Sequence, residues 1–496
     1  MVRPGSLAPS LVKIKVALAR YARSIFCLLV TAVLMTGCSV GPRYKRSLPV
    51  LQPYHNAPAI ESRAAILPSP VLDTWWTGFN DSELNKIIER ALAQNLDMAA
   101  SFARVEQARA AAREAGANRK LKFEIAGSDT ASRQSVATPI GRAVSGVIPG
   151  FNRNQNILDL GIRATWEADI FGSLRRGAEA ATAEAQAADA ESLGTRVSVA
   201  AEAADAYLQI RGAQVRLVFA DEQIATDEHL LNLVHQRRNA GVASDREVAQ
   251  AEALLSQARA TVPQLKIILE AQLNRLDVLM GVQPGTYAKE LRSPKDIPAV
   301  PGIGKSLDAA DLLRRRPDVI AAERRVAASN ARIGQALAEY YPKISLSALL
   351  GSESETPASL FRDEGFQPSL VAGLRWRLFD FGRVAAEVKQ AHGANAEALI
   401  QYRSSVLRAT EDVENAFSAL AQSELQTDEI LREISALQRA KDLSQQSYDA
   451  GVIPLTDVLD ANRQLLLAKD ELASSRENAG RAAVSSFRAL GGGWTR

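Results

Sequence analysis

Two aspartates three residues apart, Asp457 and Asp460, carry the side chains whose type and spacing offer the clearest chemistry in this chain. On a helix, residues at this spacing lie on one face, so the two carboxylates would act together. Like charges held close in a confined site concentrate cations and repel anions, and bound cations or raised carboxyl pKa values relieve part of their repulsion. The alternative is that both aspartates lie on an ordinary solvated helix face.

Other arrangements of reactive side chains are missing from the sequence. No nucleophile–base arrangement, phosphate-binding loop or metal-ligand spacing appears, and the four histidines are scattered: His55, His229, His235 and His392. The formal net charge is +3, but five basic residues lie in the first 37, which leaves 54 Lys+Arg against 56 Asp+Glu in the rest. We therefore predict no catalytic residue, no metal, no cofactor and no nucleic-acid partner.

The amino terminus is typical of an export signal. Basic residues precede an apolar stretch from Ser24 to Gly37, which is too short to cross a bilayer as a helix. The stretch ends Leu-Met-Thr-Gly before Cys38, and this segment resembles a bacterial lipobox. The resemblance implies that 1–37 is a lipoprotein signal peptide, that Cys38 is lipidated, and that Ser39 favours export to the outer membrane.

A repeated pair of dipeptides divides the chain into two similar halves. Phe171-Gly172 precedes Gly241-Val242 by 70 residues, and Phe381-Gly382 precedes Gly451-Val452 by the same number. Each interval has the composition of a long polar, alanine-rich helix, which at 1.5 Å per residue would be roughly 100 Å long. The chain is therefore expected to be an internal duplication whose unit is a strand pair joined to a very long helix.

The first half contains an N-terminal tail and the first repeat. The tail, 38–80, is rich in proline and is expected to be extended. The repeat, 81–283, should begin with a helical run to about 120 and contain a loop over about 129–155. Its two strands, long helix and shorter helix are predicted at about 121–128, 157–170, 172–240 and 244–280.

The second half repeats this order after a linker over 284–305. The second repeat, 306–491, has its two strands, long helix and shorter helix at about 343–350, 369–379, 382–450 and 454–490. Pro454 is expected in the first turn of the last helix, where proline is tolerated. A short C-terminal tail, 492–496, follows.

The predicted strands have the length and pattern of membrane-crossing strands. Each has about 10 residues, with one apolar and one polar face. Four strands cannot close a barrel, and open sheet edges are not tolerated in lipid, so several chains would have to pool their strands. Three chains would supply 12 strands, an even number in the known range. The alternative, a coiled-coil scaffold without a membrane role, leaves the strand pairs and the lipid signal unexplained.

Several stretches of the chain resemble the outer membrane efflux proteins, which are TolC-like trimeric channels, and within them the lipoprotein branch typified by OprM and NodT. The resemblance extends from the lipobox to the last residues through Trp75-Trp76-Thr77-Gly78-Phe79-Asn80-Asp81, Arg314-Arg315-Arg316-Pro317-Asp318, Ala321-Ala322-Glu323-Arg324-Arg325, Asn330-Ala331-Arg332-Ile333-Gly334, Tyr340-Tyr341-Pro342, Trp376 to Gly382, and Ala489-Leu490-Gly491-Gly492-Gly493-Trp494.

The resemblance implies a mainly α fold with membrane β-structure. In the family, a homotrimer forms a 12-stranded outer membrane β-barrel, with four strands per chain, continued by a long α-helical periplasmic barrel. The implied function is a channel in the outer membrane, not an enzyme. The implied partners are a periplasmic adaptor protein, an inner membrane pump of the resistance-nodulation-division class, and outer membrane lipid.

The resemblance also implies roles for the two helix breaks. Ala240-Gly241-Val242 and Ala450-Gly451-Val452 would be the periplasmic tips that meet the adaptor. The alternative, that these segments are mere turns, is weaker because both copies carry the same Ala-Gly-Val sequence.

The implied pore constriction lies beyond the second tip. Asp457 and Asp460 match the acidic residues of the family's constriction, and Tyr448 matches its tip tyrosine. Ile453 stands where the family has a gating arginine, so the way in which the closed state is held is open.

Three functions remain as hypotheses. The leading one is the exit duct of a tripartite efflux pump for small molecules. The second is the exit duct of a one-step protein secretion system, and the third, of a different class, is a lipid-anchored structural coiled coil. The exported substrate cannot be read from the sequence, because a wide water-filled duct selects little.

Overall fold

The computed structural model describes residues 39–46, 52–64, 68–148, 150–303, 312 and 314–495. Cys38 and the predicted signal peptide 1–37 lie outside the described residues. The described residues are 67% helical with few strands, so the predicted mainly α fold is confirmed.

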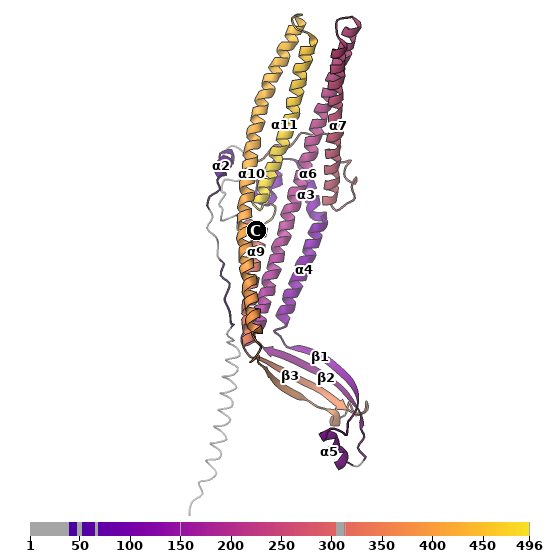
Figure 1. The fold of residues 1–496 in the computed structure, drawn as a ribbon, viewed down its shortest axis with the longest axis vertical. Coiled ribbons are helices and arrows are strands. Elements are labelled where there is room, and N and C mark those ends of the chain that lie inside the picture. The colour runs from indigo at the N-terminus through magenta and orange to yellow at the C-terminus, as the bar shows by residue number, and fades with distance from the viewer. Residues whose placement is uncertain are drawn as a thin grey trace, which may run out of the picture. The chain divides into compact units, whose positions relative to one another are not determined.

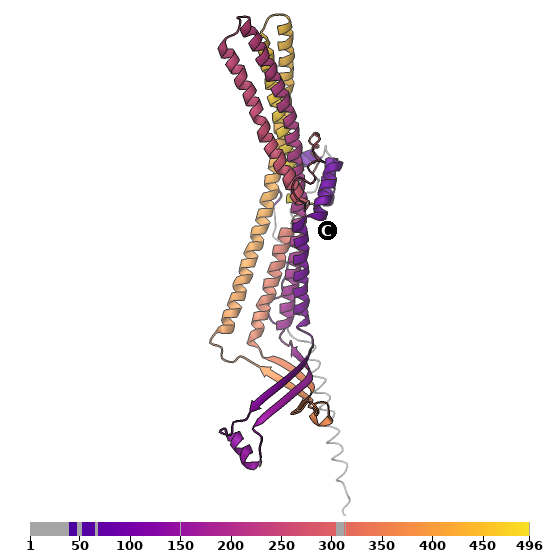
Figure 2. The same ribbon diagram turned by 90° about the vertical axis from the view of Figure 1, so that its right-hand side faces the viewer.

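Four helices form two long hairpins of matching dimensions. α6 (Ser173–Asn239) and α10 (Arg383–Asp449) each have 67 residues, and α7 (Asp245–Leu279) and α11 (Leu455–Ala489) each have 35. In each repeat the shorter helix folds back along the end of the long one (Figures 1 and 2). The 70-residue spacing of the sequence repeat thus corresponds to one long helix and its ends.

Both long helices end in the same backbone motif. Gly241 and Gly451 each have φ +74°, a left-handed conformation that glycine adopts without the steric cost of a Cβ atom. The Val452 amide donates to the Ser447 carbonyl at 2.8 Å, and the first copy makes the equivalent bond. This is a Schellman C-cap, which satisfies the last helical carbonyls and reverses the chain.

The four strands form one antiparallel sheet in chain order. They are β1 (Lys122–Arg133), β2 (Asn154–Ala168), β3 (Lys343–Ser354) and β4 (Ser369–Arg375). The two hairpins pair their strands in the same way. Lys122 at the start of β1 pairs with Thr165 of β2, and Lys343 at the start of β3 pairs with Arg375 of β4. Within the described residues β1 and β4 each have only one neighbouring strand, so each leaves an open edge.

The sheet has one apolar and one polar face. On the polar face Ser128 donates to Asp159 at 2.9 Å, and Arg163 and Glu124 form an ion pair at 3.5 Å. Residues paired across the strands share a face, and on the other face they are mostly large and apolar: Phe123, Ile125, Leu160, Ile162, Trp166, Ile344, Leu346, Leu350, Leu370 and Leu374. Several of these side chains are exposed to a degree unusual for such residues, for example Ile125 at 79%.

A tryptophan marks the same position in both hairpins. The Trp166 indole donates to the Arg119 carbonyl at 3.2 Å, and the Trp376 indole donates to the Tyr340 carbonyl at 3.0 Å. Such half-exposed rings with one satisfied polar atom are typical of a boundary between apolar and wet surroundings.

The structure corrects several predicted boundaries in the strand region. β1 and β3 extend to Arg133 and Ser354, beyond the predicted ends at 128 and 350, whereas β4 ends at Arg375 rather than near 379. The predicted loop over 129–155 contains a helix, α5 (Pro139–Val147), whose N-cap Thr138 accepts a hydrogen bond from Gly141. A proline at the start and a threonine cap favour this helix locally, a signal that the loop prediction overlooked.

The amino-terminal region is also more helical than predicted. The tail expected to be extended contains α2 (Ala57–Ala64) and the 3-10 helix η1 (Leu72–Phe79). The helical run after it is two helices, α3 (Ser82–Gln94) and α4 (Leu96–Ala117). Between them Asn95 is buried, donates to the Leu279 carbonyl at 2.9 Å and accepts from the Met98 amide at 3.0 Å, so a long-range contact holds the break.

In the described part of the second repeat a helix precedes the strands. α9 (Pro317–Leu337) continues into the 3-10 helix η2 (Ala338–Tyr340), and η3 (Asp363–Gly365) lies in the loop between β3 and β4. The linker from 284 to 303 has no helix or strand.

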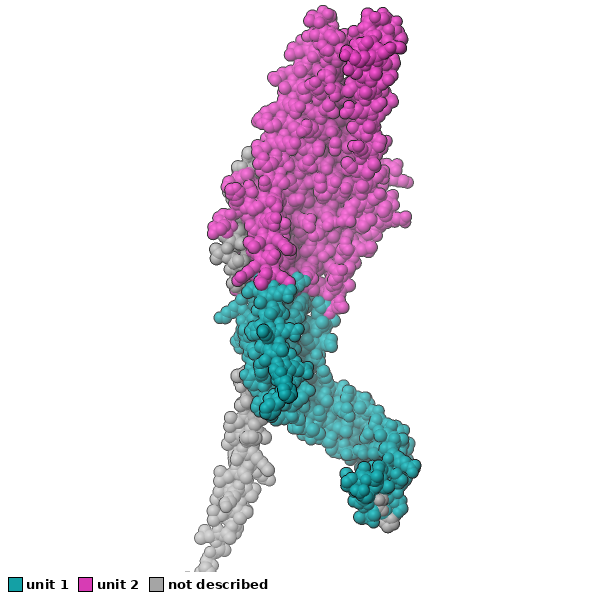
Figure 3. Space-filling model, viewed as in Figure 1, with its two compact units in different colours: residues 1–45, 108–185, 325–399 teal, residues 46–107, 186–324, 400–496 magenta. Residues whose placement is uncertain are grey.

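The chain divides into two compact units that cut across both repeats (Figure 3). Unit 1 comprises Met1–Lys45, Ala108–Ala185 and Arg325–Leu399, and it contains all four strands. Unit 2 comprises the rest, Arg46–Gln107, Gln186–Arg324 and Ile400–Arg496, and it contains both helix tips.

In each unit a cluster of small buried residues brings helices close together. In unit 1 Ala183 packs with Ala327 and Ala328, and in unit 2 Ala187 and Ala190 pack with Ala321. Alanine allows close approach of helix backbones without a thick apolar layer. Unit 2 also has an aromatic centre, in which fully buried Trp75 stacks on Phe487 with ring centroids 5.3 Å apart. The Trp-Trp motif is therefore a packing element.

Candidate functional site

The two helix tips present small, exposed residues. The tips are defined as Ala240-Gly241-Val242 and Ala450-Gly451-Val452, and their valines are 64% and 76% exposed. A Cβ atom built on either glycine would meet nothing within 4 Å. Exposed apolar side chains beside open glycines form a surface that another protein could approach closely.

The helices that follow the tips start differently. In the first hairpin Ser244 and Glu247 form a capping box, in which the Ser244 amide donates to Glu247 at 2.6 Å. The hydrogen bonds from the Ser244 amide and hydroxyl hold the pKa of the Glu247 carboxyl below its usual value. In the second hairpin Pro454 precedes α11 as a cap without a side-chain hydrogen bond, rather than lying in its first turn as predicted.

The predicted constriction residues lie directly behind the second tip. Asp457 is exposed in the first turn of α11. The Asp460 carboxylate accepts from Arg463 at 2.9 Å and from Gln464 at 2.8 Å. The Tyr448 carbonyl accepts the Gly451 amide at 2.8 Å within the C-cap. A ring of such carboxylates would need further copies of the chain and stays a prediction.

Arg463 is a site residue that sequence reasoning missed. It lies three residues after Asp460, a spacing at which a helix brings opposite charges together, so the sequence did contain a signal. Its guanidinium neutralises part of the Asp460 charge, which leaves Asp457 as the less compensated of the two aspartates.

Polar contacts join α6 and α11 over much of their length. Arg216 donates to both carboxylate oxygens of Asp470 at 2.9 and 3.2 Å, and Arg481 donates to Asp205 at 2.7 Å. Nearer the tips Asn462 donates to Thr226 at 3.0 Å. We refer to this contact as the α6–α11 seam. Its ion pairs hold two helices of different hairpins together.

Glu477 is a partly buried acid in the α6–α11 seam. Its carboxylate lies so close to Gly212 of α6 that a Cβ atom there would overlap it. Burial raises the pKa of Glu477 to about 7, although Arg481 and Arg216 favour its ionised form.

We expect the Glu477 carboxyl to make the stability of the protein depend on pH. Because its folded-state pKa is raised, its contribution is fully present below the unfolded value, 4.5, and is lost as pH rises through about 7. The loss would approach roughly 3 kcal/mol. Thermal unfolding at pH 5 and pH 8 should show this loss in the unsubstituted protein and not in Glu477→Gln. The exposed control Glu471→Gln should behave as the unsubstituted protein, and a loss that persists in Glu477→Gln would assign it to another group.

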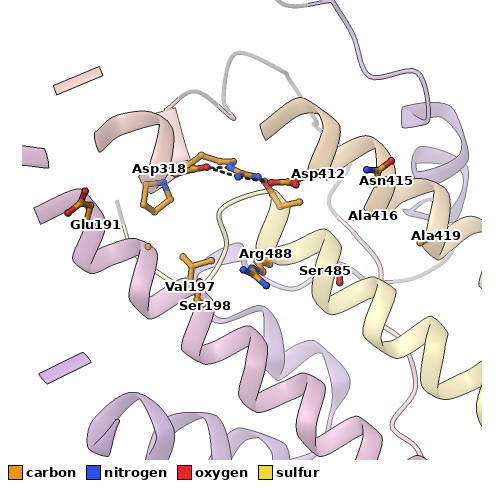
Figure 4. A pocket seen from close by; sticks show the side chains of 14 residues that line it. Glu191, Val197, Ser198, Asp318, Asp412, Asn415, Ala416, Ala419, Ser485 and Arg488 are labelled. Carbon is orange, nitrogen blue, oxygen red and sulfur yellow. Dashed lines mark hydrogen bonds and ion pairs between the residues drawn. The ribbon is translucent and has the colours of Figure 1, made fainter. Parts of the chain in front are cut away.

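A cavity of about 700 Å³ lies farther along unit 2, lined by α6, α9, α10 and α11 (Figure 4). Arg316 is central to it and donates to Asp318 at 2.7 Å and to Asp412 at 2.8 Å. The same guanidinium donates to the Ala489 carbonyl at 3.2 Å. The hydrogen bonds of the Arg316 guanidinium thus connect the start of α9 to α10 and α11.

The neighbouring arginine of the same motif has a similar structural role. Arg315 forms an ion pair with Asp73 at 2.6 Å and also donates to the Trp494 carbonyl at 3.3 Å. Gly491, at φ +69°, packs against the Arg315 carbonyl, where a Cβ atom would lie at 2.8 Å. The Arg-Arg-Pro-Asp and terminal glycine motifs therefore meet in space and hold the amino- and carboxy-terminal segments together.

Within the ranges that the structure describes, no group of three or more His, Cys, Asp or Glu residues could hold a metal ion.

None of the helices described here is both long enough and apolar enough to cross a membrane.

Comparison with known proteins identifies the fold and the family. The family model for outer membrane efflux proteins matches residues 87–282 and 309–492. The pyoverdine export outer membrane protein OpmQ of Pseudomonas aeruginosa is 32% identical over 420 residues, which cover 85% of this chain and 87% of that protein. Nodulation protein T of Rhizobium leguminosarum bv. viciae is 28% identical over 473 residues, 94% of this chain and 92% of that protein.

Solved structures give the same result. The outer-membrane channel OprN superposes with a TM-score of 0.83 at 32% identity, covering 92% of this chain and all of that one. The open state of the Neisseria gonorrhoeae MtrE outer membrane channel superposes with a TM-score of 0.73 at 25% identity, covering 92% and 99%. These matches confirm the resemblance drawn from the sequence motifs and the expected outer membrane location: the chain belongs to the outer membrane efflux protein family.

Proposed function

We propose that this protein is the exit duct of a tripartite efflux pump, which carries small molecules from an inner membrane pump and its adaptor across the periplasm and outer membrane. The observation that carries the proposal is the duplicated unit itself: two strand hairpins, each followed by a 67-residue helix that ends in an exposed tip. Helices of this length suit a protein that spans a long distance.

The sheet supports assembly as a homotrimer. Its apolar face suits lipid and its polar face suits water, but the open edges of β1 and β4 could not persist in a bilayer. Three copies would pair β4 of one chain with β1 of the next and close a 12-stranded barrel.

The detergent-solubilised protein is accordingly expected to have the mass of a trimer. Because β1 and β4 need partners, dissociation into monomers should unfold the sheet. Native mass spectrometry measures the mass, and circular dichroism measures the β-structure that remains. A monomer that retains its full β-structure would rule out shared closure.

The partners are proposed from the relatives. OpmQ is named for pyoverdine export and OprN is described as an outer-membrane channel. A periplasmic adaptor would meet the two tips, and a pump of the resistance-nodulation-division class would supply the substrate and the energy. Which molecules are exported would then depend on the pump.

Single-channel recording in a planar bilayer tests the duct. The purified protein should give discrete conductance steps, whereas a lipid-anchored structural coiled coil would give none. Affinity capture of the tagged protein from cells distinguishes an efflux duct from the exit duct of a protein secretion system. An efflux duct would co-purify with an efflux pump and its adaptor, whereas a secretion duct would co-purify with a secretion transporter.

The mature protein is expected to be acylated at Cys38. The prediction follows from the basic and apolar signal that ends at this cysteine. Mass spectrometry of the amino-terminal peptide should show a lipid-modified cysteine as the first residue. An unmodified chain that begins before Cys38 would show that the segment is not a lipoprotein signal.

A further inference from the structure

A second carboxylate of unit 2 lies buried behind the tips without an opposite charge bonded to it. Asp227 of α6 is only 2% exposed, and both of its oxygens accept from the Gln223 amide nitrogen, at 2.9 and 3.0 Å. No ion pair of the described residues includes Asp227. Burial raises the pKa of its carboxyl, and the Gln223 hydrogen bond and the Arg463 charge offset only part of this effect.

The two guanidinium groups near Asp227 that line the same cavity are engaged elsewhere. Arg463 donates to Asp460 at 2.9 Å, and Arg216 is held by both oxygens of Asp470. The Gln223 side-chain oxygen is itself buried and has no donor among the described residues. The Asp227 carboxylate is therefore held by one amide group and by no ion pair among the described residues, and the Gln223 oxygen beside it has no hydrogen-bond donor. A buried acceptor without a donor, such as the Gln223 oxygen, destabilises the folded state.

These two side chains line a cavity of about 220 Å³ among α6, α7 and α11. The rest of its lining is eight apolar residues, among them Phe219, Leu254 and Leu466, and six polar ones: Arg216, Gln257, Thr261, Gln264, Arg463 and Asp470. At its rim Ile268 is 40% and Leu467 is 53% exposed, so apolar surface faces the opening. A second cavity of about 170 Å³ is also lined by Asp227, Leu254 and Arg463.

We propose that this cavity binds a small primary amine with an apolar body. The ammonium group would donate to the Asp227 carboxylate and the Gln223 oxygen, and the body would lie against the leucines and Phe219. Charge complementarity selects the cation, since both lining arginines are paired with other aspartates and an ammonium group offers three donors and a positive charge to Asp227. Size selects an aryl- or alkyl-ammonium ion, because the cavity is smaller than the roughly 300–1,000 Å³ of pockets for drug-sized ligands.

The test uses the full-length trimer and 2-phenylethylamine as the probe, with neutral 2-phenylethanol as the matched ligand. Ligand-detected NMR should show saturable binding of the amine to the unsubstituted protein and binding of the alcohol weakened by about tenfold or more, the effect of losing one charge-assisted hydrogen bond. Asp227→Asn should reduce amine binding by a similar factor and leave alcohol binding unchanged.

Two further variants distinguish binding in this cavity from nonspecific electrostatic attraction of the amine to the protein. Asp221→Asn removes the same charge from an exposed position of α6 and should bind the amine normally. Ala220→Leu keeps Asp227 but fills part of the cavity, so it should weaken binding of both probes. Because all lining residues come from three helices, the bound amine should also raise the thermal midpoint of the unsubstituted protein and not of Asp227→Asn.

Equal amine binding by the unsubstituted protein and Asp227→Asn would overturn the proposal, and so would equal binding of the amine and the alcohol. The latter result would mean that Asp227 is held protonated and that the cavity recognises only an apolar body. Both results would leave the duct function untouched, since conductance and pump capture are measured without the amine.

Discussion

Replacing Gly451 by tryptophan is expected to abolish pump-dependent efflux while export and trimer assembly stay intact. Gly451 lies at the second tip with φ +74°, and a Cβ atom there would meet no other atom of the chain within 4 Å. The substitution therefore leaves the protomer itself free of clashes, but it places a large side chain where the adaptor is proposed to dock. Cells that carry the variant should be as drug-sensitive as cells without the gene.

A matched control separates the docking effect from the backbone cost. Gly285 also has a left-handed conformation, φ +93°, and open space around it, but it lies in the linker after the first repeat. Tryptophan at either position carries the same backbone penalty, of order 1–2 kcal/mol. Gly285→Trp should therefore retain efflux. Normal drug resistance in cells expressing Gly451→Trp would count decisively against adaptor contact at this tip.

The double substitution Asp457→Asn with Asp460→Asn is expected to remove the cation selectivity of the resting pore. In a trimer these residues would place six carboxylates around one opening and create a potential of several kT, which concentrates cations and repels anions. Bilayer recordings under a salt gradient should give a cation-selective reversal potential for the unsubstituted protein and a value near zero for the variant. Block by a trivalent cation from the periplasmic side should weaken by about tenfold or more.

The structure refines this prediction. Asp460 is partly neutralised by Arg463 at 2.9 Å, whereas Asp457 is exposed near the start of α11. Asp457→Asn alone should therefore lower selectivity more than Asp460→Asn alone.

A control for the acidic ring lies in the other hairpin. Asp221→Asn with Glu252→Gln removes the same number of exposed charges from α6 and α7, and it should leave selectivity unchanged. Equal reversal potentials and equal block in the unsubstituted protein and the Asp457/Asp460 double variant would show that the two aspartates are only a solvated helix face.

The sequence alone determined the repeating architecture of the protomer. Helix length depends on where glycine and proline interrupt a periodic pattern, and the equal 70-residue spacings therefore predicted two long helices, observed as 67 residues each. Alternating polarity likewise predicted the strand pairs, because side chains of a strand point to opposite faces in turn. These signals are local, so no knowledge of distant contacts was needed. The same reasoning missed α5, where the cap and the proline were present but were assigned to a loop.

The tertiary structure decided which polar side chains lose water and which find partners. Asp227 is an unremarkable acid in a polar helix, and only the packing of α6 against α7 and α11 buries it beside an apolar cavity. The α6–α11 seam joins residues more than 200 positions apart, such as Arg216 and Asp470. Whether a charged side chain stabilises or destabilises the fold depends on the groups around it in space. The sequence shows only its neighbours along the chain, so it does not show which distant residues will surround the charge.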